Sequence, residues 1–163
     1  MQGLRLQLNY GWLNAKHKEY LELGANVAAN RAVVHAPKHT FNAVVDAELG
    51  RAPYGTWRAV ADYAWATSYY LYPYPFTLAP GDTPSQLAAN TRVKTAGFLN
   101  LRLLLADIPA GGERSANVSL WVRNAFDKKH IGNLIDFGPS FGNLTQAYFV
   151  DPRTFGVSAT LRF

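Results

Sequence analysis

Alternation between apolar and polar side chains governs the last ten residues of the chain, 154–163. Every second position there is apolar, namely Phe155, Val157, Ala159, Leu161 and Phe163. A period of two places the apolar side chains on one face of a β-strand and the polar ones on the other. Strands of outer-membrane β-barrels alternate in this way, with polar groups toward the lumen and aromatic residues at the membrane interfaces. The segment therefore predicts a strand of a transmembrane β-barrel.

The same alternation recurs in five earlier segments, so the sequence predicts six strands. In the first of them Leu4, Leu6 and Leu8 share one face, and polar residues share the other. Lengths near ten residues suit a tilted strand that crosses a membrane. We expect the strands at residues 2–15, 39–49, 56–69, 95–106, 116–125 and 154–163.

Connections between the expected strands are long and short in turn. The short ones are turns at residues 50–55 and 108–113, whereas the first, third and fifth connections are long. Long loops on one side and short turns on the other are typical of outer-membrane barrels. We therefore expect an all-β fold, an antiparallel up-and-down transmembrane β-barrel segment of about six strands. Because the smallest such barrels have about eight strands, we expect residues 1–163 to be an incomplete barrel.

Composition excludes several other classes of protein. No run of about 18 apolar residues is present, so a transmembrane helix is not expected. The chain has no cysteine, which excludes a disulfide scaffold and thiol chemistry. The formal net charge is +5, but Lys and Arg are scattered along the chain, so we expect no nucleic-acid partner.

Four motifs resemble those of one known family. Residues 118–129 read Val-Ser-Leu-Trp-Val-Arg-Asn-Ala-Phe-Asp-Lys-Lys. They resemble the penultimate strand of TonB-dependent outer-membrane receptors, which typically ends in Asn-Leu-Phe-Asp-Lys and an aromatic residue; Ala125 and His130 depart from that pattern. Further segments that are similar to motifs of these receptors, in the same order along the chain, are residues 36–41, 97–102 and 151–157.

The resemblance implies the C-terminal barrel portion of a receptor in the outer membrane of a Gram-negative cell. Such receptors import scarce nutrients, most often ferric siderophores. They contain a plug domain that contacts TonB, and we expect neither that plug nor a signal peptide within 1–163. The implied partners are the remainder of the receptor chain, TonB through the plug, lipid or lipopolysaccharide, and the barrel assembly machinery, which would recognise a terminal strand that ends in Phe163. Because the opening residues already alternate, we expect Met1 not to be the natural start.

Residues of the long loops are candidates for ligand contact. Tyrosines offer flat amphipathic surfaces, and arginines pair with anionic iron chelates. The candidates are Arg31, Tyr70, Tyr72, Tyr74 and Arg92. We favour the alternative in which these residues do not contact a ligand: the aromatic residues form an interface girdle, and the basic ones face lipopolysaccharide or solvent. On the inward face we expect ion pairs between a set of arginines and a set of acidic residues, namely Arg5, Arg58, Arg102, Arg123 and Arg162 with Asp46, Glu48 and Asp62.

Two patterns resemble catalytic or metal sites and are declined. Residues 138–142 match the Gly-x-Ser-x-Gly sequence of hydrolases, but the required strand before the serine and helix after it are not expected. His35 and His39 have a zinc-site spacing for a helix, yet Pro37 lies between them. We therefore expect no enzyme, no cofactor and no metal site.

Two alternative functions remain open. One is a stand-alone outer-membrane pore or adhesin that assembles from several copies. The other is a soluble, lipocalin-like barrel that binds a ligand against inward-pointing apolar faces.

Overall fold

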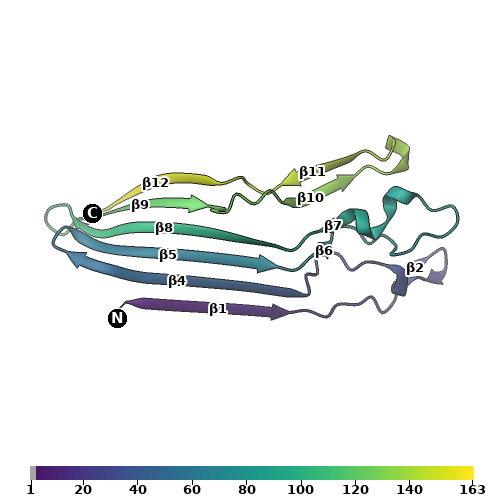
Figure 1. Ribbon diagram of the computed structural model, residues 1–163, viewed down its shortest axis with the longest axis horizontal. Coiled ribbons are helices and arrows are strands. Elements are labelled where there is room, and N and C mark those ends of the chain that lie inside the picture. Colours follow the sequence, from purple (N-terminus) through teal and green to yellow (C-terminus); the bar gives the residue numbers. More distant parts are fainter. Residues whose placement is uncertain (1–2) are drawn as a thin grey trace.

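Six strands form one antiparallel sheet in which each strand pairs with its neighbours in chain order (Figure 1). The computed structural model describes residues 3–163. The sheet is not closed, and its order is β1-β4-β5-β8-β9-β12. The strands are β1 (Leu4–Trp12), β4 (His39–Ala52), β5 (Gly55–Ala66), β8 (Ala96–Pro109), β9 (Ser115–Arg123) and β12 (Thr154–Arg162). The prediction of six strands in an antiparallel up-and-down arrangement is confirmed.

Strand ends differ from the prediction where the alternation is interrupted. β4 continues to Ala52 because the register shifts between Glu48 and Gly50, and such a bulge restores the pairing beyond it. A second shift, between Leu105 and Ile108, carries β8 to Pro109. β9 instead ends at Arg123, because Asn124 has a positive φ of 47° that no regular strand accommodates.

The pairing keeps apolar side chains on one face across all six strands. One row across the sheet consists of Leu6, Val45, Ala61, Leu101, Val122 and Phe155. The neighbouring row on the opposite face consists of Arg5, Asp46, Val60, Arg102, Trp121 and Gly156. The apolar face is open, since Leu4, Leu6 and Leu8 are 57%, 59% and 58% exposed and Phe155 is 82% exposed.

Long loops project from one end of the sheet, and the start of β1 and the end of β12 lie with the short turns at the other (Figure 1). The loops contain the strand pairs β2 (Leu21–Glu22) with β3 (Ala25–Asn26), β6 (Tyr69–Tyr70) with β7 (Arg92–Val93), and β10 (Ile131–Asp136) with β11 (Thr145–Phe149). Short 3-10 helices span Ala28–Asn30, Pro84–Gln86, Ala88–Thr91 and Pro139–Phe141. Within residues 3–163, no helix has the length and apolar character needed to cross a membrane.

The buried apolar cluster of the described residues lies among the loops. Leu71, Val93 and Leu134 are its members, each less than a tenth exposed, and Tyr69 and Tyr72 pack against it. Leu71 and Val93 belong to the second long loop, whereas Leu134 belongs to the third. Burial of apolar area therefore stabilises the association of these two loops.

A chain of side-chain hydrogen bonds crosses the polar face from β1 to the segment before β12. Asn9 donates to Asn42 at 3.3 Å, and Asn42 donates to one carboxylate oxygen of Asp62 at 3.1 Å. Asn100 donates to the other oxygen of Asp62 at 3.1 Å and accepts from the backbone N–H of Asn124 at 3.0 Å. We call this set the amide ladder; it links β1, β4, β5 and β8 to the end of β9.

Asn124 closes the amide ladder at the base of the third loop. Its side chain is buried, donates to the carbonyls of Lys128 and Asp151 at 3.1 Å each, and accepts from the N–H of Lys128 at 2.9 Å. Asp127 fixes the same base, because its carboxylate accepts the N–H of Arg153 at 3.1 Å. These bonds bring together the two ends of the loop that connects β9 to β12.

Replacement of Asn124 by alanine should destabilise the fold by about 1–3 kcal/mol, because the backbone groups of Lys128 and Asp151 lose the hydrogen bonds that the buried Asn124 side chain makes. Asn143→Ala is the matched control, since Asn143 also has a positive φ, 60°, but is exposed and accepts one side-chain hydrogen bond, from the hydroxyl of Ser85 at 2.7 Å. Equilibrium unfolding in guanidinium measures both variants. Equal effects of the two substitutions would show that the buried bonds contribute nothing beyond backbone strain.

Candidate functional site

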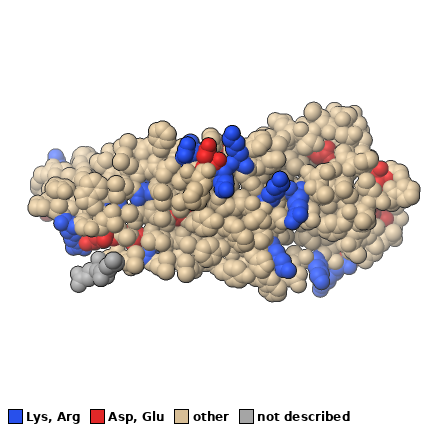
Figure 2. Space-filling model, viewed as in Figure 1, with Lys and Arg blue, Asp and Glu red and all other residues tan. Residues whose placement is uncertain are grey.

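A hollow of about 780 Å³ lies between the first long loop, residues 13–38, and the start of the second, residues 67–95. Its charged lining is basic, and no Asp or Glu occurs among the described residues that line it. The basic members are Lys16, His17, Lys18, Arg31 and Lys38. Tyr69, Tyr70 and Phe76 supply aromatic surface. We call this site the basic hollow. Figure 2 shows basic side chains gathered near the middle of the molecule and along one border of its loop half.

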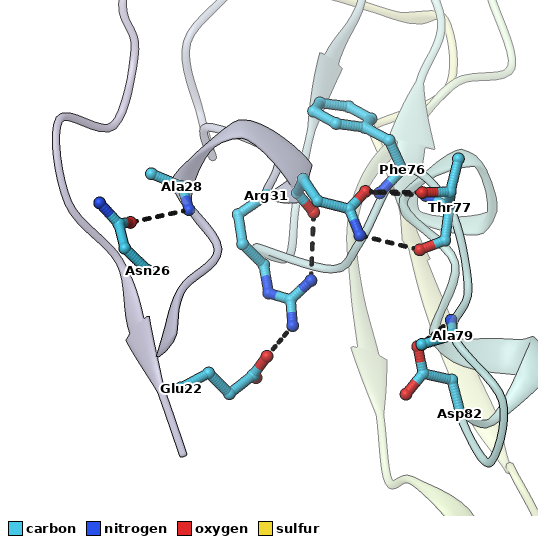
Figure 3. Close-up of polar contacts among 9 residues, drawn as sticks. Glu22, Asn26, Ala28, Arg31, Phe76, Thr77, Ala79 and Asp82 are labelled. Atoms are coloured by element: carbon cyan, nitrogen blue, oxygen red, sulfur yellow. Dashed lines mark hydrogen bonds and ion pairs between the residues drawn. The ribbon is translucent and has the colours of Figure 1, made fainter. Parts of the chain in front are cut away.

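Hydrogen bonds between the two loops hold the walls of the basic hollow together. The side-chain oxygen of Asn30 accepts the N–H groups of Phe76 and Thr77 at 3.1 and 3.0 Å, and its amide donates to the carbonyl of Thr77 at 2.9 Å (Figure 3). Backbone bridges join Arg31 to Pro75 and Val34 to Tyr70. The loops therefore meet through specific bonds as well as apolar contact.

Arg31 lies in the wall of the basic hollow, with its side chain 11% exposed. Its guanidinium pairs with Glu22 and donates to the carbonyl of Asn30 at 3.1 Å (Figure 3). It also lies 5.9 Å from the ring centroid of Tyr20. Arg31 also borders a second hollow of about 690 Å³, which Glu22 and Asp82 line. Much of the Arg31 charge is thus compensated by Glu22.

Tyr70 and Arg92 lie opposite each other in the β6–β7 pair. Tyr70 lines the basic hollow and packs edge-on against Phe76, with ring centroids 5.6 Å apart. The guanidinium of Arg92 donates to the hydroxyl of Ser68 at 2.8 and 3.2 Å, and Arg92 does not line the basic hollow. The structure therefore brings Arg31 and Tyr70 together at one site and leaves Arg92 outside it.

Tyr72 and Tyr74 join the second loop to the third. Their rings stack with centroids 5.2 Å apart, and the hydroxyl of Tyr74 donates to the carboxylate of Asp136 at 2.6 Å. The hydroxyl of Tyr72 donates to the carbonyl of Leu134 at 3.4 Å and accepts the N–H of Asp136 at 3.3 Å. Both phenols therefore already have protein partners, and Tyr74 lines the second hollow rather than the basic one.

Burial shifts the titration of two groups in the loops. Burial first, and then the hydrogen bond to Asp136, raises the pKa of Tyr74 to about 12. Burial lowers the pKa of His130, whose ring packs edge-on against Phe98 at 5.8 Å. Tyr74 is consequently a neutral hydrogen-bond donor at neutral pH.

The lysines of the basic hollow were not among the predicted ligand residues. Lys16 and Lys18 lie near the start of the first loop, and Lys38 ends it. The two ends of a hairpin loop must meet where its strands pair, and Leu13 donates to the carbonyl of Lys38 at 2.9 Å. Basic residues at both ends of one loop were therefore the signal in the sequence.

One of the expected ion pairs on the polar face forms as predicted, since Arg58 binds Asp46 at 2.6 Å. Glu48 instead binds Arg51 at 2.7 Å, and Asp62 accepts the amides of the ladder. The guanidinium of Arg123 stacks over the ring of Trp121 at 5.4 Å. Among residues 3–163, no ion pair is found for Arg5, Arg102 or Arg162.

The Gly-x-Ser-x-Gly motif and His35 lie in loops, whereas His39 is the first residue of β4. Pro139–Phe141 forms a short 3-10 turn that begins after Gly138, at a φ of 75°, so no strand leads into Ser140. His35 packs against Tyr69, whereas Nδ1 of His39 lies 2.7 Å from the hydroxyl of Tyr10. Among residues 3–163, no group of three or more His, Cys, Asp or Glu side chains is placed to hold a metal ion.

No protein-family model, no curated protein and no solved structure matches this chain.

The raised pKa of Tyr74 predicts how the contact between the second and third loops depends on pH. A raised pKa in the folded state means that the contact is fully stabilised below about pH 10 and is lost as the pH rises through about 12. Titration of tyrosinate absorbance should show one late component near pH 12, which Tyr74→Phe removes and Tyr54→Phe, at a distant exposed turn, retains. A late component that survives Tyr74→Phe would contradict the assignment.

Proposed function

We propose that the chain forms part of the barrel wall of a TonB-dependent receptor in the outer membrane of a Gram-negative cell. In this role the apolar face contacts lipid and the polar face lines the lumen. The long loops lie outside the cell and capture a scarce nutrient, most simply a ferric siderophore. The proposal rests first on one observation, the continuous exposed apolar face that the register maintains across six strands.

The exposed apolar area of this face favours lipid over water as its environment. Leu4, Leu6, Leu8 and Phe155 are each more than half exposed. At roughly 25 cal/mol for each Å² of apolar surface removed from water, a face this large is unstable in water and favoured in a bilayer. The polar face suits the lumen. It carries the side chains of the amide ladder and of the Arg58–Asp46 pair, and polar and charged groups are costly to place against lipid.

The open edges of the sheet support a place within a larger barrel. β1 and β12 each pair with one neighbour only among the described residues, so one side of each strand has free N–H and C=O groups. Such groups cost several kcal/mol each in lipid. The remainder of the receptor chain would supply the missing strands, together with the plug and its contact with TonB.

Phe163 lies at the exposed end of the apolar face, 91% exposed. This position supports a role as the feature that the barrel assembly machinery recognises, in line with the family resemblance. The loops would capture the nutrient first, and movement of the plug would then release it into the lumen. The contribution of this chain is to bind the nutrient in its loops and to form part of the lumen wall.

A pair of adjacent leucines in β8 tests the assignment of the two faces. Leu103 pairs with Ala59 and Leu120 on the apolar face, and Leu104 pairs with Arg58 and Ser119 on the polar face. Leu103→Arg should destabilise the membrane-inserted form by about 2–4 kcal/mol, the cost of arginine facing lipid, while Leu104→Arg should cost much less. Heat-modifiable protein in outer-membrane fractions measures assembly.

Equal assembly of the two variants would contradict the membrane role. A soluble lipocalin-like barrel would leave both variants in the soluble fraction. An assembly of several copies of the chain alone would give a native band that is a multiple of 18.0 kDa, without a larger polypeptide.

A further inference from the structure

Half of the lysines of the chain line the basic hollow. The chain has six lysines, and Lys16, Lys18 and Lys38 line the basic hollow. The other three, Lys94, Lys128 and Lys129, lie outside it. Three of the chain's six lysines therefore line one cavity between the first and second long loops.

The lysines of the basic hollow are free to bind a ligand. Within residues 3–163, no hydrogen bond or ion pair engages the ammonium groups of Lys16, Lys18 or Lys38. The fourth cation, Arg31, is held by Glu22 in the wall. Because no carboxylate lines the described part of this cavity, its positive potential is uncompensated from within. Converging cations raise the local concentration of an anion and increase its association rate.

Aromatic side chains form a second part of the lining. Tyr69 and Tyr70 are half-buried, and Phe76 packs edge-on against Tyr70, so the rings are fixed in place. Rings held in this way offer flat faces and edges to the planar groups of a ligand. A volume of about 780 Å³ lies in the range of small-molecule sites, which runs from about 300 to 1,000 Å³.

We infer that the basic hollow selects a polyanionic ferric chelate that carries aryl groups over a neutral chelate of similar size. This inference rests on the proposed function, which supplies the ferric chelate as cargo, and it adds the charge and the ring content of that cargo. Lys16, Lys18 and Lys38 contact the anionic oxygens, and Tyr69, Tyr70 and Phe76 contact the rings. Arg31 is bonded within the wall, and because it pairs with Glu22 it contributes less net positive charge to the cavity than each lysine does.

Two synthetic probes separate charge from iron binding. A hexadentate ferric tris-catecholate is trianionic and carries three aryl rings, whereas a hexadentate ferric trihydroxamate is neutral and has none. A ferric complex of a tricarboxylate, anionic and without rings, separates the contribution of the rings from that of charge. Binding of labelled iron is measured on outer membranes that display the native receptor containing this chain, at low and high salt.

The tris-catecholate should bind best, and the tricarboxylate complex should bind more tightly than the neutral trihydroxamate. Replacement of Lys16, Lys18 and Lys38 together by glutamine should weaken binding of the tris-catecholate roughly tenfold or more, since three attractive charge pairs are lost. Replacement of Lys94, Lys128 and Lys129 by glutamine changes the net charge equally and should leave the affinity unchanged. In the unmodified receptor, affinity should fall as salt increases.

Equal binding of the trianionic and neutral complexes, or equal effects of the two triple substitutions, would overturn the inference and leave the proposed function intact. Heat-modifiability confirms that each variant is assembled. If the first triple variant does not assemble, the salt dependence of the unmodified receptor decides, because affinity that does not change with salt contradicts an electrostatic site. If the native protein that contains this chain is absent from outer membranes, the proposed function is contradicted instead.

Discussion

The structure depends on the register of its six strands. Side chains alternate with a period of two, so a slip of one residue would move every leucine of a strand to the polar face. The amide ladder opposes such a slip, because Asp62 can accept both Asn42 and Asn100 only when three strands are aligned. The Arg58–Asp46 pair links two of these strands, β4 and β5, nearer the short turns. Polar contacts on one face thereby maintain the apolar character of the other.

The same alignment positions the loops. Asn124 connects the ladder to both ends of the third loop, and the Tyr74–Asp136 bond connects that loop to the second. The second loop in turn meets the first through Asn30 and Thr77, and the basic hollow forms between them. A sheet one layer thick has no core of its own, so the loop half provides the buried apolar cluster around Leu71, Val93 and Leu134. The basic hollow and the buried apolar cluster therefore both lie in the loop half of the molecule, beyond the long strands.

Alternation in the sequence was sufficient to predict the six strands, their order and their two faces, because each property follows from a local period. It was not sufficient to predict the ends of β4 and β8, since a bulge shifts the period by one residue and hides the remaining pairs. The β10–β11 pair was expected only as loop. The bonds of Tyr74 and Asn30 join residues 62 and 47 positions apart, and no local pattern reports such contacts. Arg31 and Tyr70 were predicted for ligand contact and do line the basic hollow, but its three lysines become neighbours only when the loop closes. The family resemblance named Asn124 as part of a motif without giving its role.

Exposure of neighbouring residues to lipid tests the central claim most directly. Val157 lies on the apolar face of β12 and Ser158 on the polar face, where it accepts a hydrogen bond from the indole N–H of Trp121 at 3.1 Å. Because the chain contains no cysteine, Val157→Cys and Ser158→Cys each give a labelling site that is unique within it. A fluorophore on each, in vesicles with brominated acyl chains, reports contact with lipid. The account predicts strong quenching at position 157 and weak quenching at position 158. Equal quenching at the two positions, or the reverse order, would contradict it.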